Sequence, residues 1–261
     1  MAPITAVIDT STSNDKVIKL FYNTGKAQLG LALWSATKDA DPEDSIQSPQ
    51  EVGNGQCILN PSHMTSVNYQ GVERVFALTT ANPFKVTRHD IYTLSEVSPL
   101  TFGIGRQLWE MNLQTSQSNS LLWTHDLWIN SFAAAWYDTT TGKRSVIYES
   151  STLVEYVVGD EEPGIHITPT GDMQRNTPVA AAFDAGTVYL YYCGRGAAGG
   201  IRRTIRTNST WGNSILIGGH SIAQDSQLTV VRDNGVNHLF YVARDQDEEE
   251  DDYFVHYIDE I

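Results

Sequence analysis

Short apolar strands alternate with polar turns along this chain, and one arrangement of them recurs. In this arrangement a strand that ends in aromatic residues is followed by a short polar turn and a second strand. The copies begin at Val17, Val72, Phe132, Thr187 and Asn237. Apolar and polar residues that alternate over a few positions are typical of half-buried strands, and no segment keeps a helical period over about a dozen residues. The pattern predicts an all-β protein built from repeats.

Further short strands flank each copy of the repeat. The runs ITAVID and MTSVNY precede two of the copies, and QLWEMNL and TLVEYVV are strands that follow the aromatic pairs. Four strands in roughly 50 residues are the content of one β-propeller blade. The aromatic strands expected to be equivalent are Leu20–Tyr22, Val75–Ala77, Ala135–Tyr137, Leu190–Tyr192 and Leu239–Tyr241.

The repeat predicts one β-propeller domain over residues 1–261, with about four antiparallel strands per blade. Five blades are preferred, and the long interval Leu94–Asn130 leaves room for a sixth. The last copy has three strands before Ile261, so we expect the N-terminal segment to supply its outer strand and cover an exposed edge.

The composition is that of a packed globular protein with an acidic surface. Hydrophobic residues make up 41% of the chain, charged residues 18%, and the formal net charge is −14. This negative balance repels phosphate backbones and anionic lipids, so neither nucleic acid nor a membrane is an expected partner. The acidic run Asp245–Asp252 lacks the turn glycine of a calcium loop and is expected to be a solvated loop.

The cysteines and the search for targeting signals place few constraints on the fold and the location of the protein. Cys57 and Cys193 are too few for a disulfide framework. No signal peptide is recognisable, and no run approaches the roughly 18 apolar residues that span a bilayer. The expected location is the cytoplasm, and a homodimer is left open.

The short motifs of metal, nucleotide and serine chemistry are absent from the sequence. It contains no HExxH, CxxC, GxxxxGK[ST] or GxSxG, and its seven histidines show no metal-ligand spacing. The glycine-rich run Gly194–Gly200 precedes no helix and indicates a turn rather than a phosphate loop. No metal and no other cofactor is expected. A glycosidase with paired carboxylates stays open, because the sequence does not give the carboxylate separation.

The turn and the strand that follows it have their own signature. An aromatic pair is followed by a D/N-x-G turn, and the fourth copy continues as GGIRRTIRTNSTWGNS. This repeat resembles that of fungal fucose-binding lectins, with Trp211 at the expected tryptophan. The resemblance implies sugar sites that take an arginine from the aromatic strand, a glutamate from the next strand and aromatic residues from the adjoining blade. Such polar groups bind ring hydroxyls while an aromatic face covers the apolar side of the sugar.

The expected sugar ligands are mostly missing when the copies are aligned by their aromatic strands. The arginine position then falls on Lys19, Arg74, Ala134, Tyr189 and His238, and the glutamate position on Leu29, Val146, Arg203 and His256. Only Arg74 matches the family. The alignment therefore predicts a lectin-like scaffold that binds fucosides weakly or not at all.

Two functions remain open at this point. The first is a carbohydrate-binding module in which Arg74 is the best surviving sugar ligand. The second is a cofactor-free enzyme. The chain is similar to fungal lectin-like hetero-Diels–Alderases, which join a tropolone quinone methide to a humulene-type sesquiterpene, in its length, its repeat and its lost sugar ligands. This likeness favours the enzyme, a pericyclase of secondary metabolism with small-molecule substrates.

A pericyclase needs little classical machinery. An apolar cavity holds the two reactants in the reacting geometry, and a hydrogen-bond donor stabilises charge on the quinone-methide carbonyl. The predicted catalytic donors are Arg74, Tyr189, Arg203, His238 and His256, and the predicted ligand-binding walls are Trp123, Trp128 and Trp136.

Overall fold

The computed structural model describes residues 3–9, 17–24, 29–36, 47–52, 57–58, 64–69, 72–80, 90–92, 99–104, 107–112, 117–124, 126–128, 131–196, 199–223, 226–243 and 255–261. These residues form 23 β-strands and two short 3-10 helices, and no α-helix occurs among them. The prediction of an all-β chain is confirmed. Within the described ranges, no helix is long and apolar enough to cross a bilayer.

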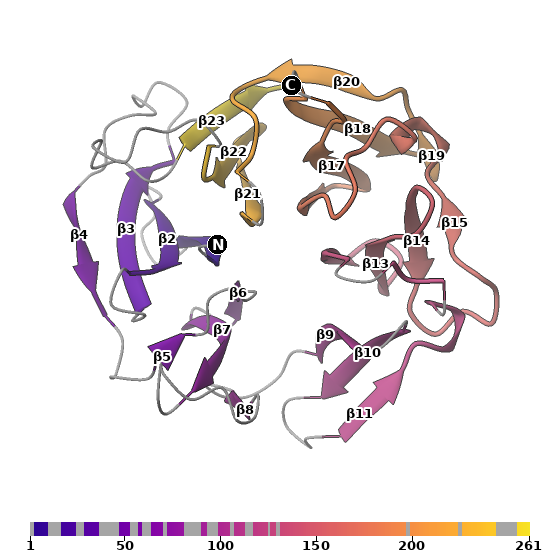
Figure 1. Ribbon diagram of the computed structural model, residues 1–261, viewed down its shortest axis with the longest axis horizontal. Helices are drawn as coiled ribbons and strands as arrows, with labels where there is room; N and C mark the ends of the chain where they lie inside the picture. Colours follow the sequence, from indigo (N-terminus) through magenta and orange to yellow (C-terminus); the bar gives the residue numbers. More distant parts are fainter. Residues whose placement is uncertain are drawn as a thin grey trace. The chain divides into compact units, whose positions relative to one another are not determined.

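The chain packs as two compact units, residues Met1–Leu94 with Ile222–Ile261 (unit 1) and residues Ser95–Ser221 (unit 2). Each unit contains several antiparallel sheets in which strands that follow one another along the chain are mostly paired (Figure 1). The acidic run Asp245–Asp252 and the side chain of Cys57 lie outside the described residues.

The described residues of unit 1 form three sheets. The first has the order β1 (Ile4–Asp9), β2 (Val17–Asn23), β3 (Leu29–Ser35) and β4 (Gln47–Glu51). The second has the order β5 (Cys57–Ile58), β7 (Val72–Thr80) and β6 (Met64–Tyr69), with β8 (Asp90–Tyr92) also paired to β7. The third consists of β21 (Leu228–Asp233), β22 (Val236–Tyr241) and β23 (Val255–Glu260).

Three sheets are also seen in the described part of unit 2. One has the order β11 (Gln117–Ser120), β10 (Gln107–Asn112) and β9 (Pro99–Ile104). The next has β12 (Ala133–Asp138), β13 (Lys143–Glu149), β14 (Leu153–Val157) and β15 (Ile165–His166). The last has β16 (Val179–Asp184), β17 (Thr187–Cys193), β18 (Ile201–Thr207) and β19 (Thr210–Trp211), with β20 (Ile215–Gly218) also paired to β18. The 3-10 helices are Leu122–Thr124 and Thr168–Thr170.

The described residues thus form six sheets rather than the five preferred from the sequence. The additional sheet, β9–β11, lies in the interval that had room for a sixth blade. The N-terminal strand β1 pairs with β2 in its own sheet, so the expectation that this segment completes the last sheet was wrong.

Four of the five aromatic strands are equivalent, and the third is not. Strands β2, β7, β17 and β22 are each the second strand of a hairpin, whereas Ala135–Tyr137 lies on β12, the first strand of its hairpin. The aromatic residues Trp136 and Tyr137 before the turn at Asp138 match the sequence pattern of the repeat, but Tyr137 is exposed and not buried as in the other copies. The true counterpart of this strand is β13, whose Tyr148 is buried.

The register of the hairpins shows this correspondence. In four sheets a buried or half-buried tyrosine of the second strand faces the first residue of the first strand. The pairs are Tyr22 with Ile4, Tyr148 with Ala133, Tyr192 with Val179 and Tyr241 with Leu228. This common register allows positions to be compared between sheets from the structure rather than from short aromatic runs.

A hydroxyl at the start of three sheets fixes the second strand to the incoming chain. Each hydroxyl accepts a hydrogen bond from a backbone N–H at or just after the end of the second strand, at 2.8, 2.8 and 3.1 Å. The pairs are Ser131 with Glu149, Thr177 with Cys193 and Ser226 with Val242. Since unpaired buried amides are costly, this recurring bond stabilises the connection between the incoming chain and the end of the second strand in these three sheets.

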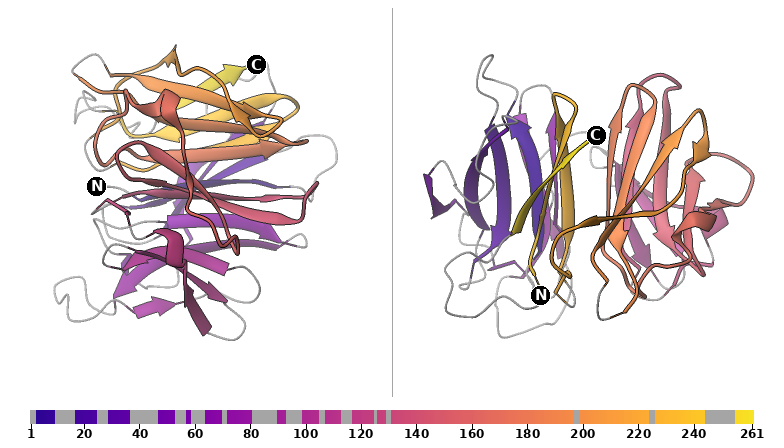
Figure 2. Two further views of the ribbon diagram at one scale, coloured as in Figure 1. Left: turned by 90° about the vertical axis from the view of Figure 1, so that its right-hand side faces the viewer. Right: turned by 90° about the horizontal axis from the view of Figure 1, so that it is seen from above.

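Unit 1 joins the beginning of the chain to its end (Figure 2). The side chain of Gln227, just before β21, accepts hydrogen bonds from the backbone N–H groups of Ile4 at 3.1 Å and Met64 at 3.0 Å. Its amide nitrogen donates to the carbonyl of Met64 at 2.9 Å. The side chain of Gln227 therefore connects β1 and β6 to the start of β21. These are the first β-strand of one sheet, an edge strand of the second and the first strand of the third sheet of unit 1.

We expect the substitution Gln227→Ala to destabilise the protein, because three backbone groups lose their partner. An unsatisfied buried group costs about 1–3 kcal/mol. Urea unfolding followed by circular dichroism measures the change, with Gln50→Ala, an exposed position on β4, as the control. Equal unfolding free energies for the two variants would contradict this role of Gln227.

Candidate functional site

The five predicted donors do not form one group in the described structure. Arg74 lies on β7 opposite Val67 in unit 1, and only its backbone is described. Tyr189 and Arg203 lie on the neighbouring strands β17 and β18 of unit 2, and Tyr189 is buried. His238 and His256 lie in unit 1.

The two histidines are in direct contact. His238 Nδ1 and His256 Nε2 are 3.0 Å apart, and the rings stack with centroids 5.2 Å apart. His256 also stacks on Phe240, with centroids 4.4 Å apart. His238 is 0% exposed and His256 8% exposed, so this group is closed. Burial lowers the pKa of His238, against a smaller opposing effect of Asp233.

The three tryptophans proposed as ligand walls have different environments. Trp136 is buried and belongs to the unit 2 core with Phe132 and Ile147. Trp123 and Trp128 are 37% and 46% exposed. The guanidinium of Arg175 lies 4.4 Å from the ring centre of Trp128, a cation–π contact that stabilises the connection between sheets.

The corrected register moves the family's glutamate position. On the third strand, Arg203 pairs with Tyr191 and His256 pairs with Phe240. Tyr191 and Phe240 directly precede the repeated tyrosines of their strands, Tyr192 and Tyr241. The same position in the sheet β12–β15 is Glu155 on β14, which faces Ile147. Ala134 lies on β12 and Val146 on β13, so the sequence alignment placed both one strand too early in this sheet. In the first sheet this position is Leu31 opposite Phe21, not Leu29. The sequence alignment missed Glu155 because it began this copy one strand too early.

The arginine position shifts in the same way. Tyr189, His238 and Lys19 each lie two residues inside the second strand, and the corresponding residue of β13 is Ser145 rather than Ala134. The sheet that carries the glutamate therefore has serine, not arginine, at this position.

Glu155 lies at the centre of a polar group formed by two sheets of unit 2. Trp211 Nε1 on β19 donates a hydrogen bond to Glu155 Oε2 at 2.9 Å. Arg206 Nε on β18 is 3.3 Å from the same oxygen. Glu155 is 5% exposed, and its Oε1 is buried with no hydrogen-bond partner among the described residues. The Arg206 side chain is 17% exposed.

Local structure places Trp211 at this site. Asn208 and Ser209 have φ values of 50° and 62° in the hairpin between β18 and β19, which is the left-handed conformation that asparagine tolerates best. The tight turn brings Trp211 opposite Arg206 on the neighbouring strand. The sequence indicated Trp211 as the family tryptophan, but gave no partner for it.

The carboxylate of Glu155 is held at a cost to stability. Burial raises its pKa, and the opposing effects of Arg206 and Trp211 do not cancel that of burial. A buried carboxylate with a raised pKa, a neighbouring cation and an unused acceptor oxygen is typical of functional sites. The Glu155–Arg206–Trp211 group is therefore the candidate site.

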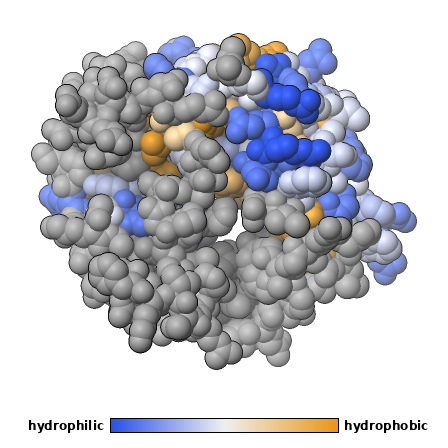
Figure 3. Space-filling model, in the orientation of Figure 1, coloured by the Kyte–Doolittle hydropathy of each residue, from blue (hydrophilic) through white to orange (hydrophobic). Residues whose placement is uncertain are grey.

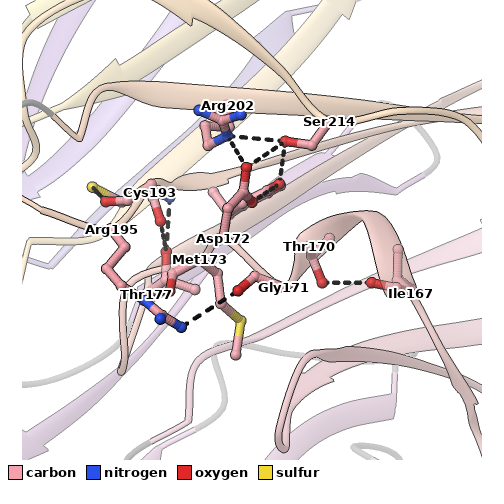
Figure 4. Close-up of polar contacts among 12 residues, drawn as sticks. Ile167, Thr170, Gly171, Asp172, Met173, Thr177, Cys193, Arg195, Arg202 and Ser214 are labelled. Atoms are coloured by element: carbon pink, nitrogen blue, oxygen red, sulfur yellow. Dashed lines mark hydrogen bonds and ion pairs between the residues drawn. The ribbon is translucent and has the colours of Figure 1, made fainter.

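The side chains of a second polar group in unit 2 bond to one another (Figure 4). Tyr192 donates to Asp172 at 2.8 Å, and Arg202 Nε donates to Ser214 at 2.9 Å while pairing with Asp172. These contacts fix the segment after Thr168–Thr170 to the sheet β16–β19. We interpret this group as structural.

The described part of the face in Figure 3 is largely hydrophilic, with small apolar areas between the polar residues. The exposed apolar residues of unit 2 include Ile165 on β15 and Leu216 on β20. Isolated apolar residues of this kind are ordinary on protein surfaces and do not indicate a site.

Solved structures similar to this chain identify the fold. A triple arginine-to-alanine variant of AofleA from Arthrobotrys oligospora matches with a TM-score of 0.62 and 12% sequence identity, over 98% of this chain and 82% of that chain. The fucose-specific lectin from Aleuria aurantia matches with a TM-score of 0.45 and 13% identity, over 99% and 77%. No protein-family model and no curated protein matches the sequence. The predicted β-propeller fold is confirmed, and at these identities the likeness shows the fold alone.

We expect Glu155→Gln to leave the protein at least as stable as the wild type at pH 7.5. The amide still accepts the Trp211 hydrogen bond, and no charge has to be buried. Because the folded state raises the pKa of Glu155, wild-type folding takes up a proton as the pH falls, so the difference should shrink toward pH 4.5. Urea unfolding at several pH values measures it, with the exposed Glu161→Gln as control. A loss of stability that grows in acid would contradict the assignment.

Proposed function

We propose that this protein is a carbohydrate-binding module on a lectin-like propeller, and that the Glu155–Arg206–Trp211 group is its binding site. The observation that carries the proposal is the buried Glu155 Oε1, an acceptor without a partner in the described ranges, beside the indole of Trp211 and the Arg206 side chain, which is 17% exposed. An acceptor, a donor and an aromatic face together match the hydroxyls and the apolar face of a sugar ring.

The site departs from the lectin pattern in the source of its cation. Ser145 stands where the same sheet of a fucose-binding lectin would carry arginine, and Arg206 instead comes from the adjacent sheet. The guanidinium is already paired with Glu155, so the pair is close to neutral as a whole. A neutral hydroxylated ligand can hydrogen-bond to both partners, whereas an acidic sugar meets the Glu155 carboxylate and is disfavoured.

We expect weak, single-site binding of neutral glycosides and none of acidic ones. Isothermal titration with methyl α-fucoside, methyl α-galactoside, methyl α-mannoside and N-acetylneuraminic acid tests this. Loss of a hydrogen bond to a charged group costs about 1.5–3 kcal/mol, so Glu155→Gln and Trp211→Phe should each weaken binding by roughly tenfold to a hundredfold.

The controls are Glu161→Gln, the same change at an exposed glutamate, and Tyr137→Phe at an exposed aromatic residue outside the group. They should bind as the wild type does. If no neutral sugar binds, on titration or on a broader glycan array, the carbohydrate proposal fails. If sugars bind and the Glu155 and Trp211 variants are unaffected, the site is elsewhere.

A cofactor-free hetero-Diels–Alder enzyme is the second candidate. It is favoured by the contact between His238 and His256, two of the five predicted donors, beside Phe240 and Trp34. An aromatic, dry setting with a hydrogen-bond donor is what stabilisation of a quinone-methide carbonyl requires. The carbohydrate site ranks first because the Arg206 side chain is 17% exposed, whereas His238 and His256 are 0% and 8% exposed.

The enzyme candidate is tested with a tropolone quinone-methide precursor and humulene. An active protein should accelerate adduct formation over buffer and favour one stereoisomer, with no need for metal, nucleotide or flavin. Removal of a carbonyl donor should cost about 2.7–4 kcal/mol of transition-state stabilisation. The variants Tyr189→Phe and His256→Phe test two of the proposed donors. Unchanged rate and product ratio with the wild-type protein would eliminate this candidate.

A further inference from the structure

The sheet β12–β15, which carries Glu155, differs from three other sheets at one cross-strand pair. In those sheets the fourth residue of the first strand is small and apolar, and the residue that pairs with it on the second strand is large and polar. The three pairs are Val7 with Lys19, Ala182 with Tyr189 and Val231 with His238. In the sheet β12–β15 the sizes are exchanged, because Trp136 on β12 pairs with Ser145 on β13.

The exchange places a buried indole N–H on the first strand of this sheet. Trp136 is 8% exposed, and its Nε1, which is a donor only, is buried with no hydrogen-bond partner among the described residues. Because nearly all buried polar groups in folded proteins have a partner, core packing alone does not account for this donor. Trp34 in unit 1 has the same property, and what distinguishes Trp136 is its place on the face of the sheet that carries Glu155.

The register places Trp136 and Glu155 on the same face. Directly paired residues share a face of the sheet, and so do residues two apart on one strand. Trp136 pairs with Ser145, and Ser145 pairs with Val157 on β14. Glu155 comes two residues before Val157 on the same strand, so β13 with the small Ser145 is the strand between the two large side chains. Trp211, which donates to Glu155 Oε2, packs against the apolar cluster of unit 2 that contains Trp136.

The two atoms without partners have opposite hydrogen-bonding character. Glu155 Oε1 is an acceptor and Trp136 Nε1 is a donor. An ammonium group only donates and a carboxylate only accepts, so either of these would serve one of the two atoms. Hydroxyl groups do both, so a neutral ligand with several hydroxyl groups serves the acceptor and the donor together.

We propose that Trp136 is a ligand-binding residue of the Glu155–Arg206–Trp211 site. Its Nε1 donates a hydrogen bond to a hydroxyl oxygen of the sugar, while Glu155 Oε1 accepts one from a sugar hydroxyl. The inference rests on the carbohydrate function proposed above and adds to it a fourth residue and a specificity. A sugar that lacks the hydroxyl facing Trp136 loses that hydrogen bond.

The test measures, by isothermal titration, binding of the neutral glycoside that binds most tightly to the wild type, together with its monodeoxy analogues. Loss of one neutral hydrogen bond should make Trp136→Phe bind the parent glycoside about threefold to tenfold more weakly. One monodeoxy analogue should bind the wild type and Trp136→Phe equally, because it lacks the hydroxyl that accepts from Nε1. The control Tyr137→Phe removes a donor from an exposed neighbour on β12 and should bind as the wild type does.

Two results would overturn this role of Trp136. One is unchanged affinity of Trp136→Phe for a glycoside whose binding Glu155→Gln weakens, and the carbohydrate function would then stand without Trp136. The other is the same loss of affinity for the parent and for every monodeoxy analogue, which would indicate altered packing rather than a lost hydrogen bond. If the wild type binds no neutral sugar, the carbohydrate function fails and this role fails with it.

A second pair of variants is used if Trp136→Phe does not fold. Trp136→Ala/Ser145→Phe copies the sizes of the native pair Ala182–Tyr189 without a donor, and Trp136→Ala/Ser145→Tyr adds one hydroxyl to the same arrangement. The first double variant should bind the parent glycoside more weakly than the second, whose hydroxyl restores a donor on this face. Equal affinities of the two double variants would overturn the role of a donor here.

Discussion

The structure depends on the antiparallel register of the first three strands in each sheet. Because side chains alternate between the two faces of a strand, a shift of one residue exchanges the buried and exposed sets. The tyrosines that face the first residue of each hairpin set this register in four sheets. Once the register is set, the residue at the glutamate position of the third strand is also set, and it is Glu155 in one sheet and His256 in another.

Those two equivalent positions carry different chemistry under the same constraint. Burial disfavours charge at both places, so it raises the pKa of Glu155 and lowers that of His238, the partner of His256. Near Glu155 the cost is partly offset by Arg206 and Trp211, and an acceptor oxygen is left over among the described residues. In the other sheet two imidazoles hydrogen-bond to each other among aromatic rings. The first position leaves a carboxylate oxygen without a partner among the described residues, and the second takes part in aromatic packing.

The fold and the function of this chain rest on different kinds of observation. The likeness to AofleA at 12% identity fixes the propeller and leaves the ligand undetermined. Buried polar atoms without a protein partner are candidates for ligand binding, and Glu155 Oε1 is one of several among the described residues. The members of the Asp172–Arg202–Ser214 group bond to one another and are structural, whereas Glu155 Oε1 has no partner in the part of the chain that the structure describes. An unused buried acceptor has to be explained by a ligand or by a penalty to stability.

The sequence by itself determined the all-β class, the repeat and the tight turns, because these depend on local alternation and turn chemistry. Trp211 stood out only through the resemblance to the lectin repeat, and the sequence did not predict it as a site residue. The sequence also did not determine strand identity in the third copy, where Trp136 and Tyr137 before the turn at Asp138 imitate the repeat. The pairing of Glu155 with Trp211 and of His238 with His256 was decided only by the tertiary structure. Both contacts join strands that are far apart in sequence or separated by an acidic run, and their distances depend on register and on packing between sheets.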